Sequence, residues 1–256
     1  MGKLEGRVAI VTGGGLGIGI SYSLSLAREG AKVVAADIAY EAAQRIAAKI
    51  NASGGEGLAV ATDVSDEKST VEMARKAHDK FGRIDILVNN AALSSEVSAH
   101  RKPWDQVTLA EWDRVMAVNT RGPWLCAKAV VPYMKTQGKG KIINISSATI
   151  FTGVRLGGMI HYVTSKGGVM AFTRALAREL GEHHINVNTM TLGFVETDTM
   201  KTIISPEARA SLVTPRCLKR AEVPEDLTGT LVFLASDDSD FITGQIVNID
   251  GGDILH

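Results

Sequence analysis

The chain has 256 residues, of which 45% are apolar and 22% are charged, and its 28 basic and 28 acidic side chains leave no net charge at pH 7. This composition is that of an ordinary globular protein, and the zero net charge argues against general nucleic-acid binding. Its two cysteines, Cys126 and Cys217, lie far apart, which excludes a disulfide scaffold and leaves too few thiols for a typical zinc or iron–sulfur site. We therefore expect no bound metal and no nucleic-acid partner.

The N-terminal residues carry no targeting pattern. Residues 1–7 lead directly into a strand pattern at Val8 and leave no room for the apolar core of a secretory signal. No apolar run approaches the roughly 18 residues that are needed to span a bilayer. We therefore expect a cytoplasmic protein with no membrane partner.

Short β-branched runs alternate with helical stretches along the whole chain. We predict strands at 8–11, 32–35, 58–60, 84–88, 141–145, 185–188 and 246–249, and helices at 17–29, 40–52, 66–81, 108–136, 160–182 and 224–235. Continuous apolar strands that are separated by helices are typical of a parallel sheet buried on both faces. The pattern predicts an α/β fold in which residues 1–256 form a single domain, a doubly wound, Rossmann-like sheet of about seven strands with helices on both faces.

Two stretches, 92–107 and 194–222, lack clear periodicity and are predicted to be loops or lids. The second stretch is bounded by Gly193 and Pro224 and carries several apolar side chains. Apolar side chains on a mobile segment suit a lid over an apolar substrate. Ordinary packing or a subunit contact would explain them equally well.

The first predicted strand runs into a glycine-rich turn that opens the first helix. Gly13, Gly17 and Gly19 have the spacing of a turn that lets the backbone approach a pyrophosphate, and Ile18 stands between the last two. The N-terminus of the following helix offers unpaired N–H groups to phosphates. Many tight turns are rich in glycine, so the position between strand and helix carries the prediction of a dinucleotide site.

Asp37 stands at the end of the second predicted strand, 18 residues after Gly19. A carboxylate at this place can accept hydrogen bonds from both hydroxyls of an adenosine ribose and repels a 2′-phosphate. Its neighbours Ala36, Ile38 and Ala39 supply no cation. We therefore expect NAD rather than NADP as the cofactor, while an ordinary turn aspartate is the alternative.

Tyr162 and Lys166 are four residues apart in a predicted helix and therefore lie on one of its faces. A free tyrosine titrates near about 10, and a cation held beside it favours the tyrosinate. Ser147 lies at the end of the fifth predicted strand, where a hydroxyl could bind a substrate oxygen. This group predicts acid–base chemistry on an alcohol or a carbonyl.

These residues occur within a longer series of motifs, and over essentially its whole length the chain resembles the short-chain dehydrogenase/reductase family. The matching motifs are Thr12-Gly13-Gly14-Gly15-Leu16-Gly17-Ile18-Gly19, Asp63-Val64, Asn89-Asn90-Ala91-Ala92, Asn119, Ser146-Ser147, Tyr162-Val163-Thr164-Ser165-Lys166 and Val247-Asn248-Ile249-Asp250-Gly251-Gly252. The family resemblance also implies a homotetramer, with the helices around 108–136 and 160–182 at one interface and the last strand at another.

The resemblance implies a catalytic tetrad. Tyr162 would be the general acid/base, Ser147 would orient the substrate oxygen, Lys166 would hold the nicotinamide ribose and lower the pKa of Tyr162, and Asn119 would anchor a water in the proton relay. Ser146 is the rival for the serine role. The cofactor contacts that the resemblance implies, besides the glycine turn, Asp37, Tyr162 and Lys166, are Asp63 and Val64 at the adenine, Asn89 along the cofactor, and Val195 and Thr197 near the carboxamide.

The chain departs from the family pattern in three places. Ala92 replaces the usual glycine, Leu192 replaces the usual proline before Gly193, and Tyr162 stands 15 positions after Ser147, somewhat more than is common in the family. The last departure predicts an enlarged loop between the two catalytic residues. Leu192 places an apolar side chain near the nicotinamide end.

The expected substrate pocket is largely apolar and has no obvious arginine at the matching places. Its candidate residues are Ser94, Val97, Ile150, Phe151, Leu192, Phe194 and Met200. They favour an NAD-dependent dehydrogenase for an uncharged cyclic, aromatic or terpenoid secondary alcohol, or its ketone. Arg101, Lys102 and Arg155 keep a carboxylate or acyl-thioester substrate open, so a 3-oxoacyl thioester reductase is the alternative enzyme. An NAD-binding sensor or scaffold is the alternative outside catalysis.

Overall fold

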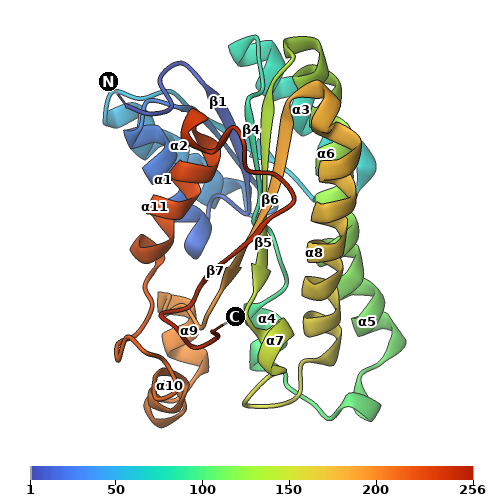
Figure 1. The fold of residues 1–256 in the computed structure, drawn as a ribbon, viewed down its shortest axis with the longest axis vertical. Helices are drawn as coiled ribbons and strands as arrows, with labels where there is room; N and C mark the ends of the chain where they lie inside the picture. The colour runs from blue at the N-terminus through green and yellow to red at the C-terminus, as the bar shows by residue number, and fades with distance from the viewer. Residues whose placement is uncertain (1, 256) are drawn as a thin grey trace.

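Seven parallel strands form one sheet in the order β3-β2-β1-β4-β5-β6-β7, which confirms the predicted doubly wound fold (Figure 1). The computed structural model describes residues 2–255. The strands are β1 Val8–Thr12, β2 Lys32–Asp37, β3 Gly57–Ala61, β4 Ile86–Asn89, β5 Gly140–Ser147, β6 Ile185–Leu192 and β7 Ile246–Ile249. The strand order reverses between β1 and β4, and sheets of this kind bind ligands beside such a point.

Helices connect the strands and differ in number from the six that the sequence predicts, because short ones occur in the predicted loops. The α-helices are α1 Ile18–Arg28, α2 Tyr40–Ala52, α3 Glu67–Phe81, α4 Ser95–Ala99, α5 Leu109–Met116, α6 Gly122–Gln137, α7 Thr149–Thr152, α8 Ile160–Leu180, α9 Asp198–Ile203, α10 Pro206–Val213 and α11 Pro224–Ala235. Short 3₁₀ turns lie at η1 Trp104–Gln106, η3 Gly181–His183 and η4 Asp237–Ser239, and η2 Ala117–Arg121 is a π-helical turn.

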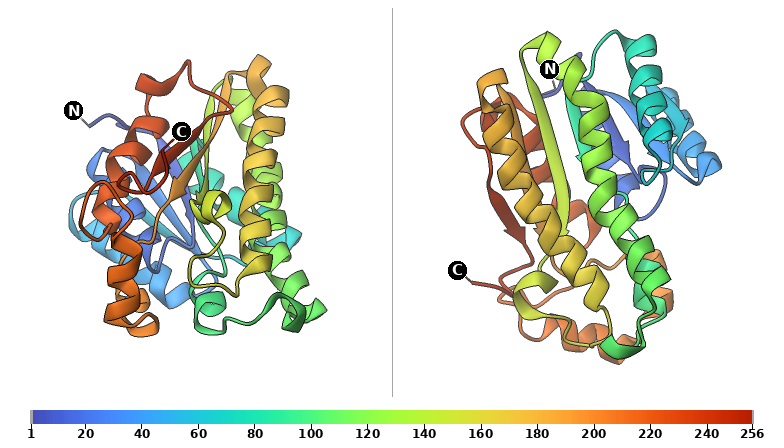
Figure 2. Two further views of the ribbon diagram at one scale, coloured as in Figure 1. Left: turned by 60° about the horizontal axis from the view of Figure 1, so that its bottom comes forward. Right: turned by 90° about the vertical axis from the view of Figure 1, so that its right-hand side faces the viewer.

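The helices cover both faces of the sheet, and each face has its own apolar core. Helices α1, α2 and α11 lie on one side, and α3, α6 and α8 lie on the other (Figures 1 and 2). Tyr22 and Leu231 belong to the first core, and Met73 belongs to the second. Side chains alternate along a strand, so Val11 of β1 joins the first core and its neighbour Ile10 joins the second. Burial on both faces explains the continuous apolar runs of the sequence.

Polar residues at the helix ends explain where several helices begin and end. The Asp66 side chain accepts a hydrogen bond from the backbone N–H of Ser69 and caps α3. Thr108 and Glu111 form a capping box at the start of α5. Gly82 ends α3 with a φ of 77°, a conformation that glycine adopts without strain. The starts that were expected at 66 and 108 are confirmed.

The predicted long helix over 108–136 is divided into α5, the π-helical turn η2 and α6. A π-helical turn holds an extra residue and changes which side chains face the core. Asn119 lies in this turn and is almost completely buried. The prediction therefore had the right extent but missed the irregularity that places Asn119.

The carboxyl ends of the strands and the segments that follow them gather at one end of the molecule. Helices α4, α7, α9 and α10 all lie there, below the sheet in Figure 1 and at the bottom of the right-hand view in Figure 2. The stretch 92–107 contains α4 and η1, and the stretch 194–222 contains α9 and α10. These two stretches are thus partly helical, in contrast to the prediction of loops.

Within residues 2–255, no helix combines the length and the apolarity that crossing a membrane requires. The same residues contain no group of three or more His, Cys, Asp or Glu side chains that could hold a metal ion. The two cysteines are unbridged, with Cys126 buried in α6 and Cys217 exposed after α10.

Candidate active site

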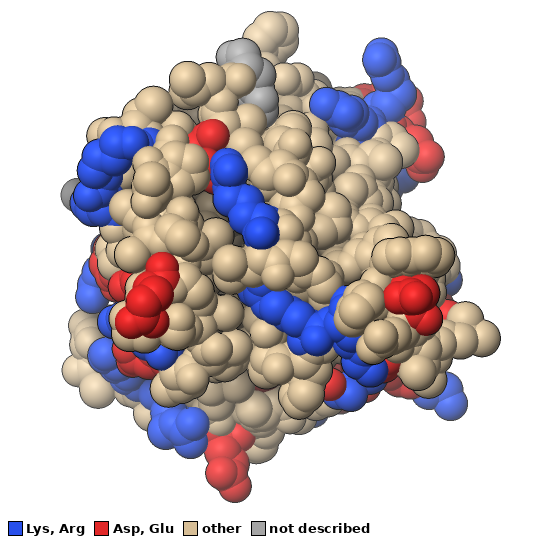
Figure 3. All heavy atoms as spheres, turned by 90° about the horizontal axis from the view of Figure 1, so that it is seen from below, with Lys and Arg blue, Asp and Glu red and all other residues tan. Residues whose placement is uncertain are grey.

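A cavity of about 870 Å³ opens at the carboxyl ends of the strands. The residues that end or follow six of the strands contribute to its wall, and the segments around α4, α7 and α9 complete it. Figure 3 views this face from below, and Lys and Arg side chains lie along the hollow near its centre. The cavity therefore occupies the position where doubly wound sheets bind their ligands.

The glycine turn after β1 forms one wall of the cavity. Gly13 and Gly17 have φ values of 62° and 53°, which a residue with a side chain rarely adopts. A Cβ atom on Gly19 would overlap the carbonyl oxygen of Gly13, so Gly19 acts through packing and does not itself line the cavity. Helix α1 begins without a side-chain cap, and its first residue, Ile18, lines the cavity. The uncapped N–H groups of this helix suit a phosphate.

Asp37 ends β2 and lines the same cavity. Its Oδ2 accepts a hydrogen bond from the N–H of Gly15 at 3.0 Å, and its Oδ1 accepts one from the N–H of Ala39 at 3.0 Å. A carboxylate has about four acceptor sites, so both oxygens retain capacity for further donors. The carboxylate is thus fixed in place and available to ribose hydroxyls.

Asp63 and Val64 follow β3 and line the cavity on the side of Asp37. The Oδ1 of Asp63 accepts hydrogen bonds from the N–H and the hydroxyl of Ser65, at 2.8 and 2.6 Å. Val64 leaves no room for a side chain at Gly122, where a Cβ would lie 2.9 Å from the Val64 side chain. Asp63 and Val64 therefore line the same cavity as Asp37, and their contact with an adenine stays a prediction.

In the Asn89-Asn90 pair, Asn89 ends β4 and Asn90 follows it, and the two side chains are placed differently from the prediction. Asn89 lies away from the cavity and donates a hydrogen bond to Asn144 at 2.8 Å. Asn90 lines the cavity, and its Nδ2 donates to the carbonyl oxygens of Thr12 and Gly13 at 2.9 and 3.1 Å. Successive residues at a strand end point in opposite directions, so a shift of one residue exchanges their roles. Asn90, which supports the glycine turn, is the residue that the sequence analysis missed.

Tyr162 lies in the first turn of α8, and its buried side chain reaches the cavity. The side chains of Ser147 and Ser94 also line the cavity and lower the pKa of this phenol by interacting with it. Ser146 is turned away, since its hydroxyl donates to the backbone oxygen of Lys166 at 2.8 Å. The structure thus brings Ser147, and not its rival Ser146, to the tyrosine. It also adds Ser94, which was expected only as a pocket residue.

The pKa of Tyr162 differs from the expectation. Burial raises the pKa of this phenol above its ordinary value, and the hydrogen bonds of Ser94 and Ser147 oppose the rise only in part. Lys166 lies with its Nζ 5.8 Å from the centre of the tyrosine ring. Removal of the phenol from water thus determines the direction of its pKa shift, and the lowering by Lys166 that the family resemblance implies stays a prediction.

Lys166 is buried one helical turn after Tyr162 and lines the cavity. Its ammonium group donates a hydrogen bond to the carbonyl oxygen of Ile145 at 2.8 Å. Burial lowers the pKa of Lys166 to about 8. An ammonium group has three N–H donors, so it can hold the backbone of β5 and still donate to ribose hydroxyls in the cavity.

Asn119 does not line the cavity, although it lies directly behind it. Its Oδ1 accepts a hydrogen bond from the N–H of Leu93 at 2.8 Å, and its Nδ2 donates to the hydroxyl of Ser165 at 3.1 Å. Asn119 thus connects Leu93, the residue before Ser94, with α8, the helix that carries Tyr162. Asn119 therefore positions the two sides of the catalytic group, and its part in a proton relay stays a prediction.

The expected substrate residues are only partly brought together. Ser94, Leu192, Phe194 and Met200 line the cavity, as do Val195 and Thr197 from the cofactor prediction. Val97, Ile150 and Phe151 do not line it. Val97 is buried in a small apolar cluster with Met159 and Tyr162, and Phe151 is 42% exposed. These positions belong to the short helices α4 and α7, whose orientation the sequence pattern does not determine.

Four arginines line the cavity, which corrects the expectation that it has no arginine at the matching places. They are Arg101, Arg114, Arg155 and Arg216. Arg101 follows α4, Arg114 lies in α5, and Arg155 lies in the loop before α8. Arg216 comes from the end of the predicted lid. The four residues are far apart in the sequence, so only the fold shows that they meet.

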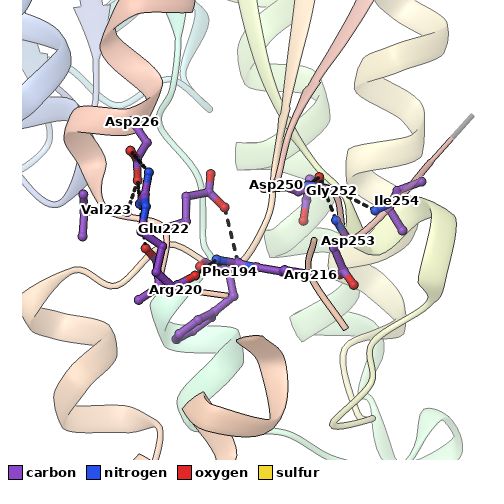
Figure 4. A network of polar contacts seen from close by, with 12 residues as sticks. Phe194, Arg216, Arg220, Glu222, Val223, Asp226, Asp250, Gly252, Asp253 and Ile254 are labelled. Atoms are coloured by element: carbon purple, nitrogen blue, oxygen red, sulfur yellow. Dashed lines mark hydrogen bonds and ion pairs between the residues drawn. The ribbon is translucent and has the colours of Figure 1, made fainter. Parts of the chain in front are cut away.

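Arg216 is the centre of a buried polar network at the end of β6 (Figure 4). Its Nη2 donates to the carbonyl oxygen of Phe194 at 2.8 Å and lies 3.3 Å from Oε2 of Glu222. A Cβ on Gly193 would lie 2.5 Å from the same Glu222 oxygen, so this position requires glycine. The carbonyl oxygen of Glu222 accepts a hydrogen bond from the N–H of Glu196. The network thus fixes the backbone between Leu192 and Thr197, which forms a wall of the cavity.

The residues present fit a nicotinamide dinucleotide. The glycine turn is a cradle that Cβ atoms would fill, and Asp37 and Lys166 offer a fixed acceptor and donor for ribose hydroxyls. When bound, the nicotinamide would supply the group that accepts or donates a hydride. Tyr162 can then hold or release a proton at its hydroxyl, and Ser147 can orient a substrate oxygen beside it.

The comparisons with known proteins agree with this geometry. A family model described as Enoyl-(Acyl carrier protein) reductase matches residues 14–253. The 3-oxoacyl-[acyl-carrier-protein] reductase FabG of Thermotoga maritima is 36% identical over 253 residues, which cover 99% of this chain and 100% of that protein. A solved structure of a short-chain type dehydrogenase/reductase from Mycobacterium marinum matches with a TM-score of 0.91 at 32% identity and covers 99% of this chain and 98% of that one. The chain belongs to the short-chain dehydrogenase/reductase family.

Membership of the short-chain dehydrogenase/reductase family makes the chain an oxidoreductase that uses a nicotinamide cofactor. Relatives of equal similarity carry different names. The (2S)-[(R)-hydroxy(phenyl)methyl]succinyl-CoA dehydrogenase subunit BbsD of Thauera aromatica is also 36% identical, over 249 residues that cover 97% of both proteins. Within the short-chain dehydrogenase/reductase family, identity at this level fixes the reaction class and not the substrate.

Proposed function

We propose that the chain transfers a hydride between NAD(H) and a secondary alcohol or its ketone. One observation carries the proposal: Tyr162, Ser147 and Lys166 line the same cavity, where Ser147 acts on the Tyr162 phenol. A buried tyrosine with a raised pKa is protonated at neutral pH and can give its proton to a ketone oxygen. Ser147 can donate a hydrogen bond to the same oxygen.

The preference for NAD(H) rests on Asp37. Its buried carboxylate lines the cavity and is fixed by two backbone N–H groups. A 2′-phosphate would meet this negative charge, whereas ribose hydroxyls can donate to it. We expect kcat/KM to be at least about tenfold higher with NADH than with NADPH. Repulsion between two negative charges, or the loss of one charged hydrogen bond, changes the binding free energy by at least the amount that a tenfold change requires. A higher value with NADPH would contradict the assignment.

A 3-oxoacyl thioester, or its 3-hydroxy form, is the substrate class that we place first. The names of the FabG and BbsD relatives both refer to acyl groups on a carrier. The apolar composition of the expected pocket favours the opposite order, with an uncharged alcohol first and the thioester second. An uncharged apolar alcohol is the second candidate, because Leu93, Val154 and Met159 give part of the cavity an apolar wall.

The test follows NADH at 340 nm with two sets of substrates. Acetoacetyl-coenzyme A is offered with NADH, and cyclic, aromatic and terpenoid secondary alcohols are offered with NAD⁺. We expect the higher kcat/KM with the thioester. A higher value with the neutral alcohols would restore the second candidate.

A Tyr162→Phe variant separates an enzyme from a cofactor sensor. We expect the variant to bind NADH as the unchanged protein does and to lose turnover by a factor of about 10² to 10⁴, the usual contribution of a general acid. Binding is measured by NADH fluorescence. Unchanged turnover in this variant would remove Tyr162 from the chemistry, and absence of turnover in the unchanged protein with every substrate would support a sensor or scaffold.

A further inference from the structure

We propose that Arg101 binds a carboxylate carried by the substrate, so that the protein prefers oxo acids and hydroxy acids to neutral ketones and alcohols of the same shape. The proposal rests on the proposed function, because it assigns the substrate of that same cavity. Its basis is the position of Arg101, the distribution of charge around the cavity, and the apolar surface that lies beside it.

Arg101 is held against the segment that leads into the catalytic helix. The N–H of Lys102 donates a hydrogen bond to the carbonyl oxygen of Gly158 at 3.3 Å. A Cβ on Gly158 would lie 3.0 Å from the Cβ of Arg101, so the two backbones are in close contact. Met159 follows directly, and Tyr162 lies in the first turn of the helix after it. A ligand on Arg101 is therefore close to the start of the helix that carries the general acid.

The other three arginines of the cavity each have a carboxylate of their own. Arg114 contacts Glu96 at 2.8 Å, Arg155 contacts Asp253 at 2.7 Å, and Arg216 contacts Glu222 at 3.3 Å; these contacts are ion pairs. No acidic side chain among residues 2–255 forms an ion pair with Arg101. The cavity thus has one guanidinium whose charge the described protein leaves uncompensated.

The hydrogen bonds of Arg101 are also incomplete. Its Nε donates to the carbonyl oxygen of Ser98 at 3.2 Å. Its Nη1 is sealed from solvent and has no acceptor among the described residues. Burial lowers the pKa of Arg101, with no nearby carboxylate to oppose the shift. Arg101 itself lines the cavity, so a bound oxyanion would meet the part of its guanidinium that faces the cavity and not the sealed Nη1.

The surface beside Arg101 indicates what carries the anion. Leu93, Val154 and Met159 line the cavity and pack with Tyr162 in a small apolar cluster. A substrate that reaches both Tyr162 and Arg101 therefore has an apolar body between its carbonyl group and its anion. A carboxylate accepts charge-assisted hydrogen bonds from a guanidinium, which are stronger than hydrogen bonds between neutral groups. A phosphate group of a thioester carrier is the other source of an oxyanion. Such a phosphate is separated from the thioester by a long flexible chain, whereas Arg101 lies beside Gly158, just before α8 begins.

The experiment compares acids with amides of the same shape. The probes are 4-acetylbenzoate with 4-acetylbenzamide, and 5-oxohexanoate with 5-oxohexanamide. We measure kcat/KM for their reduction by NADH, and their dissociation constants by calorimetry in the presence of NAD⁺. In the unchanged protein we expect at least one acid to be favoured over its amide by about 30-fold, the effect of a partly desolvated charged hydrogen bond.

The variants assign the preference to Arg101. Arg101→Met should remove it, and Arg101→Lys, which keeps the charge and loses the fork, should retain only part of it. The matched control is the double variant Glu96→Gln with Arg114→Met, which removes a cavity arginine together with its own carboxylate. This control should keep the preference for the acid. Thermal unfolding checks that each variant is folded.

Three results would overturn the proposal, and the first two come from the acids and amides. One is an equal response to acid and amide in both turnover and calorimetry, and the other is an acid preference that survives in Arg101→Met. A third comparison, acetoacetyl-coenzyme A with acetoacetyl-N-acetylcysteamine, tests the phosphate source: a loss confined to the coenzyme A ester in Arg101→Met would also overturn the carboxylate assignment. Calorimetric binding that depends on Arg101 without any turnover would leave this proposal standing and would instead contradict the proposed function.

Discussion

Burial changes the acid strength of Tyr162 and Lys166 in opposite directions. It raises the pKa of the phenol and lowers that of Lys166 to about 8. Ketone reduction needs a protonated Tyr162 and a charged Lys166, and both conditions hold below pH 8. Above that pH Lys166 loses its proton, while Tyr162 keeps its own. We therefore expect kcat/KM for reduction to be constant around neutral pH and to decrease as the pH rises, with a midpoint near pH 8.

A pH profile of NADH oxidation with a saturating cofactor checks this prediction. A descending limb with its midpoint near the ordinary tyrosine value of about 10 would assign the titration to Tyr162 instead. The Lys166→Arg variant serves as a control, because an arginine stays charged throughout the range. If this variant is active, its descending limb should disappear.

At the level of residues, the motifs predicted the catalytic centre better than its surroundings. Tyr162, Lys166 and Ser147 line one cavity, as their spacing and strand position indicated. Asn89 was assigned in place of Asn90, because the sequence does not show on which residue β4 ends. Arg101 was considered only as one of several basic residues, since its lack of a carboxylate partner is a property of the folded chain.

At the scale of elements, the turn between β1 and α1 depends on close backbone packing. A Gly19→Ala variant would place a methyl group against the carbonyl oxygen of Gly13 and 2.9 Å from Nδ2 of Asn90. The turn must shift, so we expect NADH to bind about tenfold more weakly or worse, equivalent to about 1.4 kcal/mol. Fluorescence titration with NADH measures the change.

Gly229→Ala is the matched control for this variant. Gly229 lies in α11, is exposed, and has nothing within 4 Å of the position of its Cβ. Alanine in such a helix position should stabilise the protein by about 0.5–1 kcal/mol and leave NADH binding unchanged. An equal loss of NADH affinity in both variants would refute the packing argument for Gly19.

The network around Arg216 makes a second prediction at this scale. Glu222→Ala leaves the guanidinium, which is only 2% exposed, without its carboxylate. Removing one partner of a buried pair costs about 3–5 kcal/mol, and the loss should also reduce kcat because the backbone at Phe194 forms the cavity wall. Glu222→Gln keeps an acceptor and should lose less. Urea unfolding of both variants checks the order, and equal stabilities would contradict it.

The regular elements were predictable because they follow periodic burial and local caps. Asp66 and Thr108 cap the helices whose starts they marked. Some irregular elements were not, since the π-helical turn η2 packs against α8 and the short helix α9 packs against α4, and both partners are distant in the sequence. The segment 194–222 supplies Thr197, Met200 and Arg216 to the cavity wall, and its closure as a lid stays a proposal.

At the scale of the whole molecule, we propose a homotetramer. The strand β7 is an edge of the sheet, and Phe241, in the turn before it, is fully exposed. A second exposed aromatic residue, Trp124, lies on α6. Open edges and large exposed aromatics are typical of surfaces that another copy covers. Light scattering should give the mass of four chains.

A Phe241→Asp variant is expected to reduce this mass to that of two chains, because a charge would be buried at the interface formed by β7. Val71→Asp is the control, since Val71 is an exposed apolar residue on α3, outside both expected interfaces. It should leave the mass unchanged. A monomer in the unchanged protein would rule out the assembly.

The two cysteines have a practical consequence. Thiol reagents attack the thiolate, and burial raises the pKa of Cys126 to about 12, whereas Cys217 is exposed at the end of the segment 194–222. The natural sequence therefore offers a single reactive handle on the part of the chain that faces the cavity. A maleimide fluorophore attached there would report, without any engineering of the sequence, whether this segment moves when NADH is added.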